Sequence, residues 1–173
     1  MIEDFLKTVI KLKTVPRQGW INKLGLDDPE SVADHCYSMA TMAMLFSDLK
    51  KLDTDKILKM TLLHDLAESI TGDLTPDDTT KSNKKKMENT AMRKILSSLP
   101  ESLRDDYGKL WAEYQQNNTR EAKLLHQIDK LEMAVQADHY KKKGYTKKQL
   151  ATFFDSAKKE ISDPVLKKML KSL

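Results

Sequence analysis

Apolar residues recur at helical spacing along almost the whole chain, and this periodicity restricts the fold more than any other feature. Side chains three and four residues apart share one face of an α-helix, and the 173 residues include only five glycines. The pattern therefore predicts an all-α fold. One domain over residues 1–173 is expected, because a chain of this length can bury about two-thirds of its unfolded surface.

Proline, glycine and capping residues place the helix ends. A first helix should end near Val15, because the residue before a proline disfavours the helical region. Ser31 and Asp34 form a capping-box-like start for the next helix, and a third helix should stop at Gly72. The expected helices cover about residues 5–15, 31–49, 54–72, 82–99, 103–116 and 119–143. One or two more, over 146–173, would extend a core of about residues 5–143 and pack on its outside or on a second subunit.

His64 and Asp65 stand side by side in an apolar segment, where packing gives a helix no reason to place two metal-capable side chains. Adjacent helical residues point about 100° apart, so a shared ion would lie in a notch between this helix and its neighbours. His35 and Asp129, each beside an apolar stripe, are available as further ligands. A lone histidine beside an apolar stripe is usually a hydrogen-bonded core residue, and a lone aspartate is usually a cap or an ion-pair partner. Together they predict one divalent metal site.

The order His35, His64, Asp65, Asp129 resembles the H…HD…D signature of the HD-domain metal-dependent phosphohydrolases. Five ordered blocks are similar to the 5′-deoxynucleotidase branch of that superfamily: residues 17–20, 29–35, 64–68, 72–76 and 129–137. The resemblance covers roughly residues 5 to 140. It implies a single HD domain, a bundle of about six to eight helices around a central metal site.

The resemblance also implies roles for other polar residues. Glu68, a candidate proton carrier, and Asp73 would be active-site carboxylates, and some relatives hold a second, weaker cation at Glu68, Asp73 and the backbone of Leu74. Arg17 and Trp20, in a loop after a proline, would meet the substrate phosphate and its sugar or base. Judged as isolated residues, Glu68 could be a surface glutamate, Asp73 a turn former and Trp20 a core anchor.

The predicted ligands indicate the chemistry. Two imidazoles and two carboxylates suit Mn²⁺, Fe²⁺, Co²⁺, Ni²⁺ or Zn²⁺, Mg²⁺ is also open, and the sequence does not rank these ions. Such an ion can polarise a phosphoryl oxygen and lower the pKa of a water toward ~7. The expected reaction is removal of the 5′-phosphate from deoxyribonucleoside monophosphates. The alternatives are a different nucleotide substrate, or a non-catalytic module that binds nucleotides or a protein through the basic runs 84–86 and 141–143.

Composition limits the partners. Lysine and arginine number 30 against 26 acidic residues, a net charge of +4, so no nucleic acid is required. The run Lys84–Lys86 is most simply a solvated face, although one of its lysines could meet a phosphate at the site. The single cysteine, Cys36, cannot form an internal disulfide. No apolar run approaches the ~18 residues of a membrane span, so no membrane partner and a cytoplasmic location are expected.

The remaining predictions concern two helical residues, Glu113 and His126, and the apolar residues near the C-terminus. Glu113 could lie either in the pocket or on a helix surface, and His126 is not expected to be a metal ligand. A homodimer is predicted, since apolar residues near the C-terminus could form a larger patch than a soluble monomer usually exposes. These residues include Phe153, Phe154, Val165, Met169 and Leu170.

Overall fold

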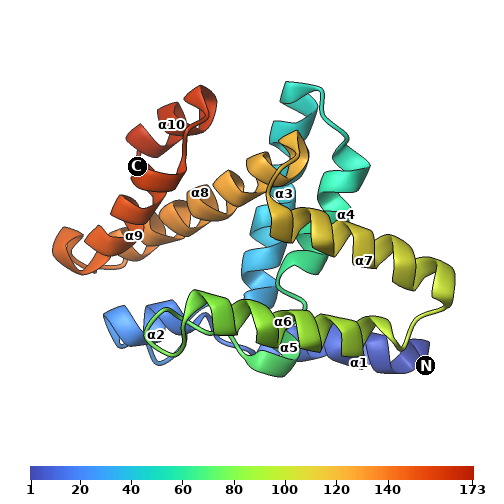
Figure 1. Cartoon of the computed structure of the whole chain (residues 1–173). Coiled ribbons are helices and arrows are strands. Elements are labelled where there is room, and N and C mark those ends of the chain that lie inside the picture. The colour runs from blue at the N-terminus through green and yellow to red at the C-terminus, as the bar shows by residue number, and fades with distance from the viewer.

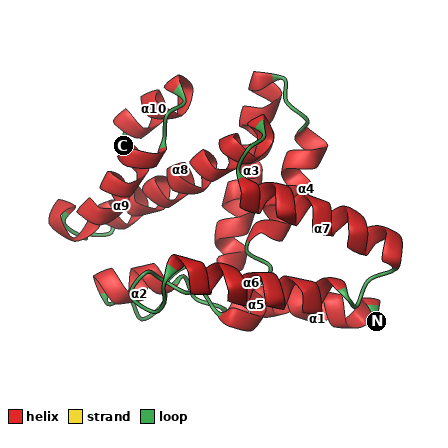
Figure 2. Ribbon diagram, in the orientation of Figure 1, coloured by secondary structure: helices red, strands yellow, loops and turns green.

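The computed structural model describes all 173 residues as a bundle of α-helices without a β-sheet (Figures 1 and 2), which confirms the all-α prediction. The elements are α1 (Ile2–Lys11), the 3₁₀ turn η1 (Leu12–Thr14), α2 (Gln18–Leu24), α3 (Val32–Lys50), α4 (Thr54–His64), α5 (Glu68–Thr71), α6 (Lys81–Leu96), α7 (Glu101–Gln116), α8 (Arg120–Lys142), α9 (Lys147–Glu160) and α10 (Pro164–Lys171). No helix is both long and apolar enough to cross a membrane.

Helices α3, α4 and α8 form the centre of the bundle. Figure 1 shows α8 crossing behind α9 toward α3, with α7 beside α4. Met39 of α3, Met60 of α4 and Ile128 of α8 are fully buried in one apolar cluster. Burying a side chain of this size contributes roughly 1.5–3 kcal/mol, so this cluster holds the three helices at fixed positions relative to one another.

Helix α3 begins where the capping residues predict. The Ser31 hydroxyl accepts a hydrogen bond from the Asp34 amide, and the Asp34 carboxylate accepts one from the Ser31 amide. This reciprocal pair satisfies two backbone donors that a helix start leaves free. It therefore fixes the first turn of α3, which carries His35.

Helix α4 ends at His64, and the prediction of one continuous helix to Gly72 is wrong. Asp65 has φ −110° and ψ 9°, residues 65–67 form a turn, and the short helix α5 follows. Because the helix breaks between the two residues, their side chains are not held 100° apart and can converge. The break also places Glu68 on a separate short helix from the one that carries His64.

Residues 18–24 form helix α2, where a loop was expected around Arg17 and Trp20. Gly25, with φ 66°, ends the helix in the left-handed conformation that glycine adopts without strain. Burial of Trp20 against Tyr140 and Phe153 gives this short helix a tertiary anchor. The helix propensity of residues 18–24 does not report such long-range packing.

The C-terminal helices pack on this chain itself. Phe153 and Leu170 are buried and Phe154 is partly buried, whereas only Val165 and Met169 of the expected dimer patch are exposed. Helix α9 lies along α8 (Figure 1). The expected C-terminal patch is therefore mostly covered within the subunit, and it is not the apolar surface that the sequence suggested.

Candidate metal centre

A cavity of about 740 Å³ opens between α2, the α5–α6 loop and helices α6 to α9. The sequence-predicted residues on its wall are Arg17, Trp20, His64, Asp65, Glu68, Asp73 and Asp129, together with Leu74. His35 lies beneath them with no exposed surface. The fold therefore brings all of these residues to one place.

The four predicted ligands converge at the base of the cavity. His35 Nε2 lies 3.4 Å from Asp129 Oδ1 and 3.6 Å from Asp65 Oδ2. His64 Nε2 lies 3.1 Å from the same Asp65 oxygen. His35, His64 and Asp129 present ligand atoms that all lie within 4.8 Å of one another. This set of nitrogen and oxygen atoms could hold one metal ion.

The tautomers of His35 and His64 support the binding of a metal ion. His35 Nδ1 lies 2.6 Å from Glu132 Oε2, and His64 Nδ1 lies 2.6 Å from the Thr61 carbonyl oxygen. An ionised carboxylate and a carbonyl only accept hydrogen bonds, so each Nδ1 donates its hydrogen. The Nε2 atoms of both rings are buried without a hydrogen-bond partner. Leaving such atoms unsatisfied is costly, and a metal ion would satisfy both, so the residues fit a metal.

The electrostatics favour ionised carboxylate ligands. Burial would raise the pKa of both aspartates, but His64 and His35 hold the pKa of Asp65 below its usual range. Lys130 and His35 likewise hold the pKa of Asp129 well below its usual value, against burial. Both groups are thus negative at neutral pH, as metal binding requires.

The carboxylates around His35 favour its protonated form. Burial and Arg17 act to lower the pKa of His35, but Asp129 and Glu132 raise it to about 10. A metal ion at Nε2 competes with a proton for that atom, so the affinity for the ion falls as the pH falls.

Glu68 stands at the start of α5 with its side chain almost fully buried. Burial and the charges of Asp65 and Asp73 raise its pKa well above the usual value. Its Oε2 atom is buried without a partner, while Oε1 faces the ammonium of Lys84. A buried carboxyl that keeps its proton at higher pH than usual is suited to proton transfer.

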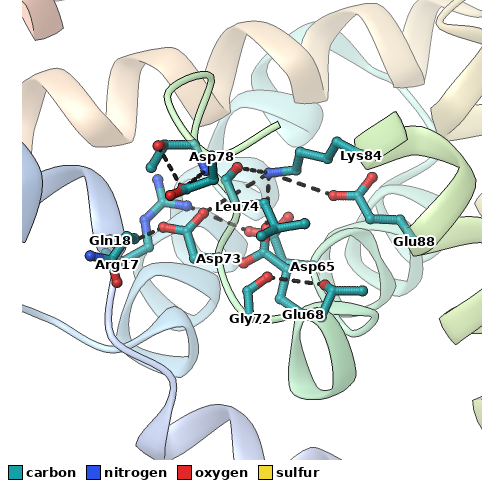
Figure 3. A network of polar contacts seen from close by, with 12 residues as sticks. Arg17, Gln18, Asp65, Glu68, Gly72, Asp73, Leu74, Asp78, Lys84 and Glu88 are labelled. Carbon is teal, nitrogen blue, oxygen red and sulfur yellow. Dashed lines mark hydrogen bonds and ion pairs between the residues drawn. The ribbon is translucent and has the colours of Figure 1, made fainter. Parts of the chain in front are cut away.

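Asp73 and Arg17 lie on the same side of the cavity (Figure 3). The Gln18 amide donates to Asp73 Oδ2 at 2.8 Å, which turns the carboxylate toward the site. Arg17 Nη1 lies 3.7 Å from Asp65 Oδ2. Burial opposes the charge on the guanidinium, but Asp73 and Asp65 raise the pKa of Arg17 further, so it stays positive.

Lys84 occupies the place expected for a second cation. Its Nζ donates to the Leu74 carbonyl oxygen at 2.8 Å and to Glu68 Oε1 at 3.3 Å, and lies 4.0 Å from Asp73 Oδ1 (Figure 3). These are the three groups at which the resemblance allows a second, weaker ion in some relatives. The run 84–86 is therefore not wholly a solvated face.

Trp20 is at once a core anchor and part of the cavity wall. It is 2% exposed, its ring lies 4.0 Å from that of Phe153, and its Nε1 donates to Glu30 Oε1 at 2.8 Å. Trp20 and Phe153 both line the cavity. The two roles weighed for this residue are thus compatible.

Sequence reasoning missed Glu132 and Lys130 at this site. Glu132 orients His35, and Lys130 Nζ lies 2.8 Å from Asp129 Oδ2. Glu132 could have been found, since it follows Asp129 by three residues on the same helix face. Glu113 instead pairs with Lys56 outside the cavity, and His126 Nε2 donates to the Tyr114 carbonyl oxygen, in keeping with its exclusion as a ligand.

Comparisons with known proteins agree with this geometry. The family model described as HD domain matches residues 9–169. The chain is 39% identical over 171 residues to the 5′-deoxynucleotidase HDDC2 of Homo sapiens, covering 98% of this chain and 83% of that protein. It is 40% identical over 177 residues to the Dictyostelium discoideum protein of the same name, covering 96% and 93%. A conserved hypothetical protein from Pyrococcus furiosus superposes with a TM-score of 0.81 at 32% identity, covering 98% and 96%.

Proposed function

The chain belongs to the HD-domain family, and from this premise we propose that it is a metal-dependent phosphomonoesterase acting on deoxyribonucleoside 5′-monophosphates. One observation carries the proposal: the Nε2 atoms of His35 and His64 are buried without partners and face two carboxylates at the base of an open cavity. The curated relatives named 5′-deoxynucleotidase support the substrate class.

The site residues have separate roles in this proposal. His35, His64, Asp65 and Asp129 would hold the divalent ion, which supplies Lewis-acid activation of the phosphoryl group and the attacking water. Arg17, charged and beside Asp65, is placed to contact a phosphate oxygen.

Glu68 moves a proton. The water gives up a proton as its oxygen bonds to phosphorus, the bond from phosphorus to the 5′-oxygen breaks, and the 5′-oxygen takes up a proton in its place. The products are the deoxyribonucleoside and inorganic phosphate. The ion itself remains open among Mn²⁺, Fe²⁺, Co²⁺, Ni²⁺, Zn²⁺ and Mg²⁺.

A phosphate-release screen tests the proposal. The purified chain is assayed on deoxyribo- and ribonucleoside 5′-monophosphates before chelation, after chelation and after each ion is returned. We expect turnover of the deoxyribonucleotides that is lost with the metal and restored with it. A non-catalytic binding module, the rival hypothesis, would show neither turnover nor metal dependence.

Selectivity for the deoxy sugar is expected to depend on Trp20. We propose that its ring walls the space beside C2′, because it lines the cavity yet is held rigidly by Phe153 and Glu30. An apolar wall alone rejects an added hydroxyl by on the order of 10²-fold. The ratio of kcat/KM for a deoxyribonucleotide over its ribonucleotide should exceed one, and it should fall toward one in Trp20→Ala. Equal rates on both sugars in the native protein would remove this role and leave the phosphatase proposal intact.

A homodimer is also proposed, through the outer face of α3 in place of the C-terminal helices. Tyr37, Met44, Leu45 and Leu49 are large apolar residues at helical spacing on α3, and all are exposed. Light scattering at micromolar concentration should give about twice the chain mass of 19.9 kDa, and Leu45→Glu should lower it to that of one chain. A native mass of one chain would exclude the dimer.

A further inference from the structure

Glu30 lies behind the cavity wall and contacts both residues proposed to bind the nucleotide. It belongs to the loop between α2 and α3, its side chain is 8% exposed, and it does not line the cavity. Its Oε1 atom accepts a hydrogen bond from Trp20 Nε1 at 2.8 Å and lies 4.0 Å from Arg17 Nε. A single buried carboxylate oxygen therefore joins Arg17 to Trp20.

The backbone fixes Glu30 on two sides. The Arg17 amide donates to the Glu30 carbonyl oxygen at 3.0 Å. This bond lies next to an antiparallel bridge between Pro16 and Ser31. The Glu30 amide in turn donates to the Tyr140 hydroxyl oxygen at 3.2 Å, which ties the loop to α8. Because these contacts hold the backbone, the carboxylate has a fixed place from which to orient other side chains.

The guanidinium of Arg17 is held between two carboxylates. Its Nε faces Glu30 Oε1, and its Nη1 lies 3.7 Å from Asp65 Oδ2. A guanidinium carries five N–H donors in a planar fork. Two fixed contacts therefore set the plane of the fork and leave other donors for a phosphate oxygen. Without Glu30, substrate binding would have to order this long side chain itself, which lowers affinity.

The indole of Trp20 depends on the same carboxylate. Trp20 is 2% exposed, and a buried N–H that loses its acceptor is costly. Phe153 packs on the ring but offers no acceptor for Nε1. The hydrogen bond to Glu30 therefore sets which edge of the indole faces the cavity.

We infer that Glu30 is a positioning residue that sets the phosphate contact of Arg17 and the sugar wall of Trp20 through one oxygen atom. Affinity for the phosphate and selectivity for the deoxy sugar then depend on the same side chain, although that side chain touches neither part of the substrate. The inference rests on the proposed function and adds a residue that determines specificity from behind the cavity wall.

Two substitutions separate the two contacts. Glu30→Leu removes both the charge beside Arg17 and the acceptor for Trp20. Glu30→Gln removes the charge but keeps an oxygen that can accept the indole hydrogen. Asp28→Leu is the matched control, because Asp28 is an exposed acid in the same loop.

Steady-state kinetics on a deoxyribonucleotide and its ribonucleotide give the first readout. Burial and Glu132 raise the pKa of Glu30 to about 7, so the assay is run above that pH, where the carboxylate is ionised. Both variants of Glu30 lose the charge, so each should raise KM on the order of 10-fold with little change in kcat. The ratio of kcat/KM for the two sugars should fall toward one in Glu30→Leu and stay near the native value in Glu30→Gln. Asp28→Leu should match the native chain in both quantities.

The indole hydrogens give a readout that does not need turnover. The chain has two tryptophans, and Trp111 Nε1 donates to a different partner, Asn89 Oδ1, at 2.8 Å. We expect exchange of the Trp20 indole hydrogen with water, followed by nuclear magnetic resonance, to be faster in Glu30→Leu than in the native chain or in Glu30→Gln. Exchange at Trp111 should be the same in all three proteins if they are folded.

Glu30→Leu must change both KM and the sugar ratio, and a native value of either would overturn the inference. If Glu30→Leu does not fold, Glu30→Gln decides, since a native KM in that variant would also overturn it. A native chain that hydrolyses no nucleotide would refute the proposed function instead. Calorimetric binding of the same two nucleotides then decides the inference: a preference for the deoxyribonucleotide that Glu30→Leu abolishes upholds it, and unchanged binding in Glu30→Leu overturns it.

Discussion

Replacing Asp65 with alanine should abolish bound divalent metal and phosphatase activity together. Asp65 Oδ2 lies within 3.6 Å of Nε2 of both His35 and His64, so it is the carboxylate shared by the two rings. Without it, the guanidinium of Arg17, now 3.7 Å from that oxygen, would lose one of the carboxylates that offset its positive charge beside the metal centre. Loss of a ligand and exposure to a positive charge both weaken cation binding.

The measurement is metal content after dialysis, alongside phosphate release from a deoxyribonucleoside monophosphate. Asp55→Ala is the matched control, because Asp55 is an exposed aspartate on helix α4, which ends directly before Asp65, and it pairs only with Lys59. That variant should keep both metal and activity. Full metal occupancy in Asp65→Ala would show that Asp65 is not a ligand.

Glu68→Gln should retain the fold and the metal but lose 10²- to 10⁴-fold in kcat, the usual cost of removing a general acid or base. Glutamine has nearly the same shape and can still accept a hydrogen bond from Lys84, but it cannot exchange a proton. The readout is turnover at saturating substrate, with metal content measured on the same sample. Near-native turnover would exclude proton transfer by Glu68.

A thermal melt distinguishes a loss of catalysis in Glu68→Gln from a loss of the folded state. Burial raises the pKa of Glu68 above its unfolded value, so in the metal-free protein its ionisation opposes folding once the pH exceeds the ordinary value of about 4.3. Glutamine does not ionise, and the variant should therefore not lose stability through this charge at neutral pH. A metal-free thermal midpoint at or above that of the native chain, with low kcat, identifies a chemical defect. Glu88→Gln, which also faces Lys84, should lose much less activity.

The sequence predicts the long helices well because their ends are encoded locally. Ser31, Thr80 and Thr119 each cap a helix with a side-chain oxygen, and Pro100 immediately precedes α7. These signals operate within a few residues. The four predicted ligands stand out for a similar reason, since their residue types contrast with apolar flanks.

What the sequence does not predict depends on contacts between distant segments. The short helix α2 is anchored by the packing of Trp20, and no local pattern reports that packing or the break after His64. Three consecutive lysines are equivalent in composition, yet only Lys84 has the helical phase that directs it at Glu68. The spacing of Glu132 to Asp129 places it near the site, but its hydrogen bond to His35 joins residues 97 positions apart and is not visible in the sequence.

The proposed ligands come from three helices, with His35 on α3 and Asp129 on α8. An unfolded chain cannot hold such distant side chains around one ion, so the ion binds only the folded state and acts as a reversible cross-link. At a free-ion concentration 100 times Kd, this coupling adds about 2.7 kcal/mol to the free energy of unfolding. A cell short of the ion would then lose the protein to proteolysis as well as its activity, so metal supply would govern abundance and turnover together.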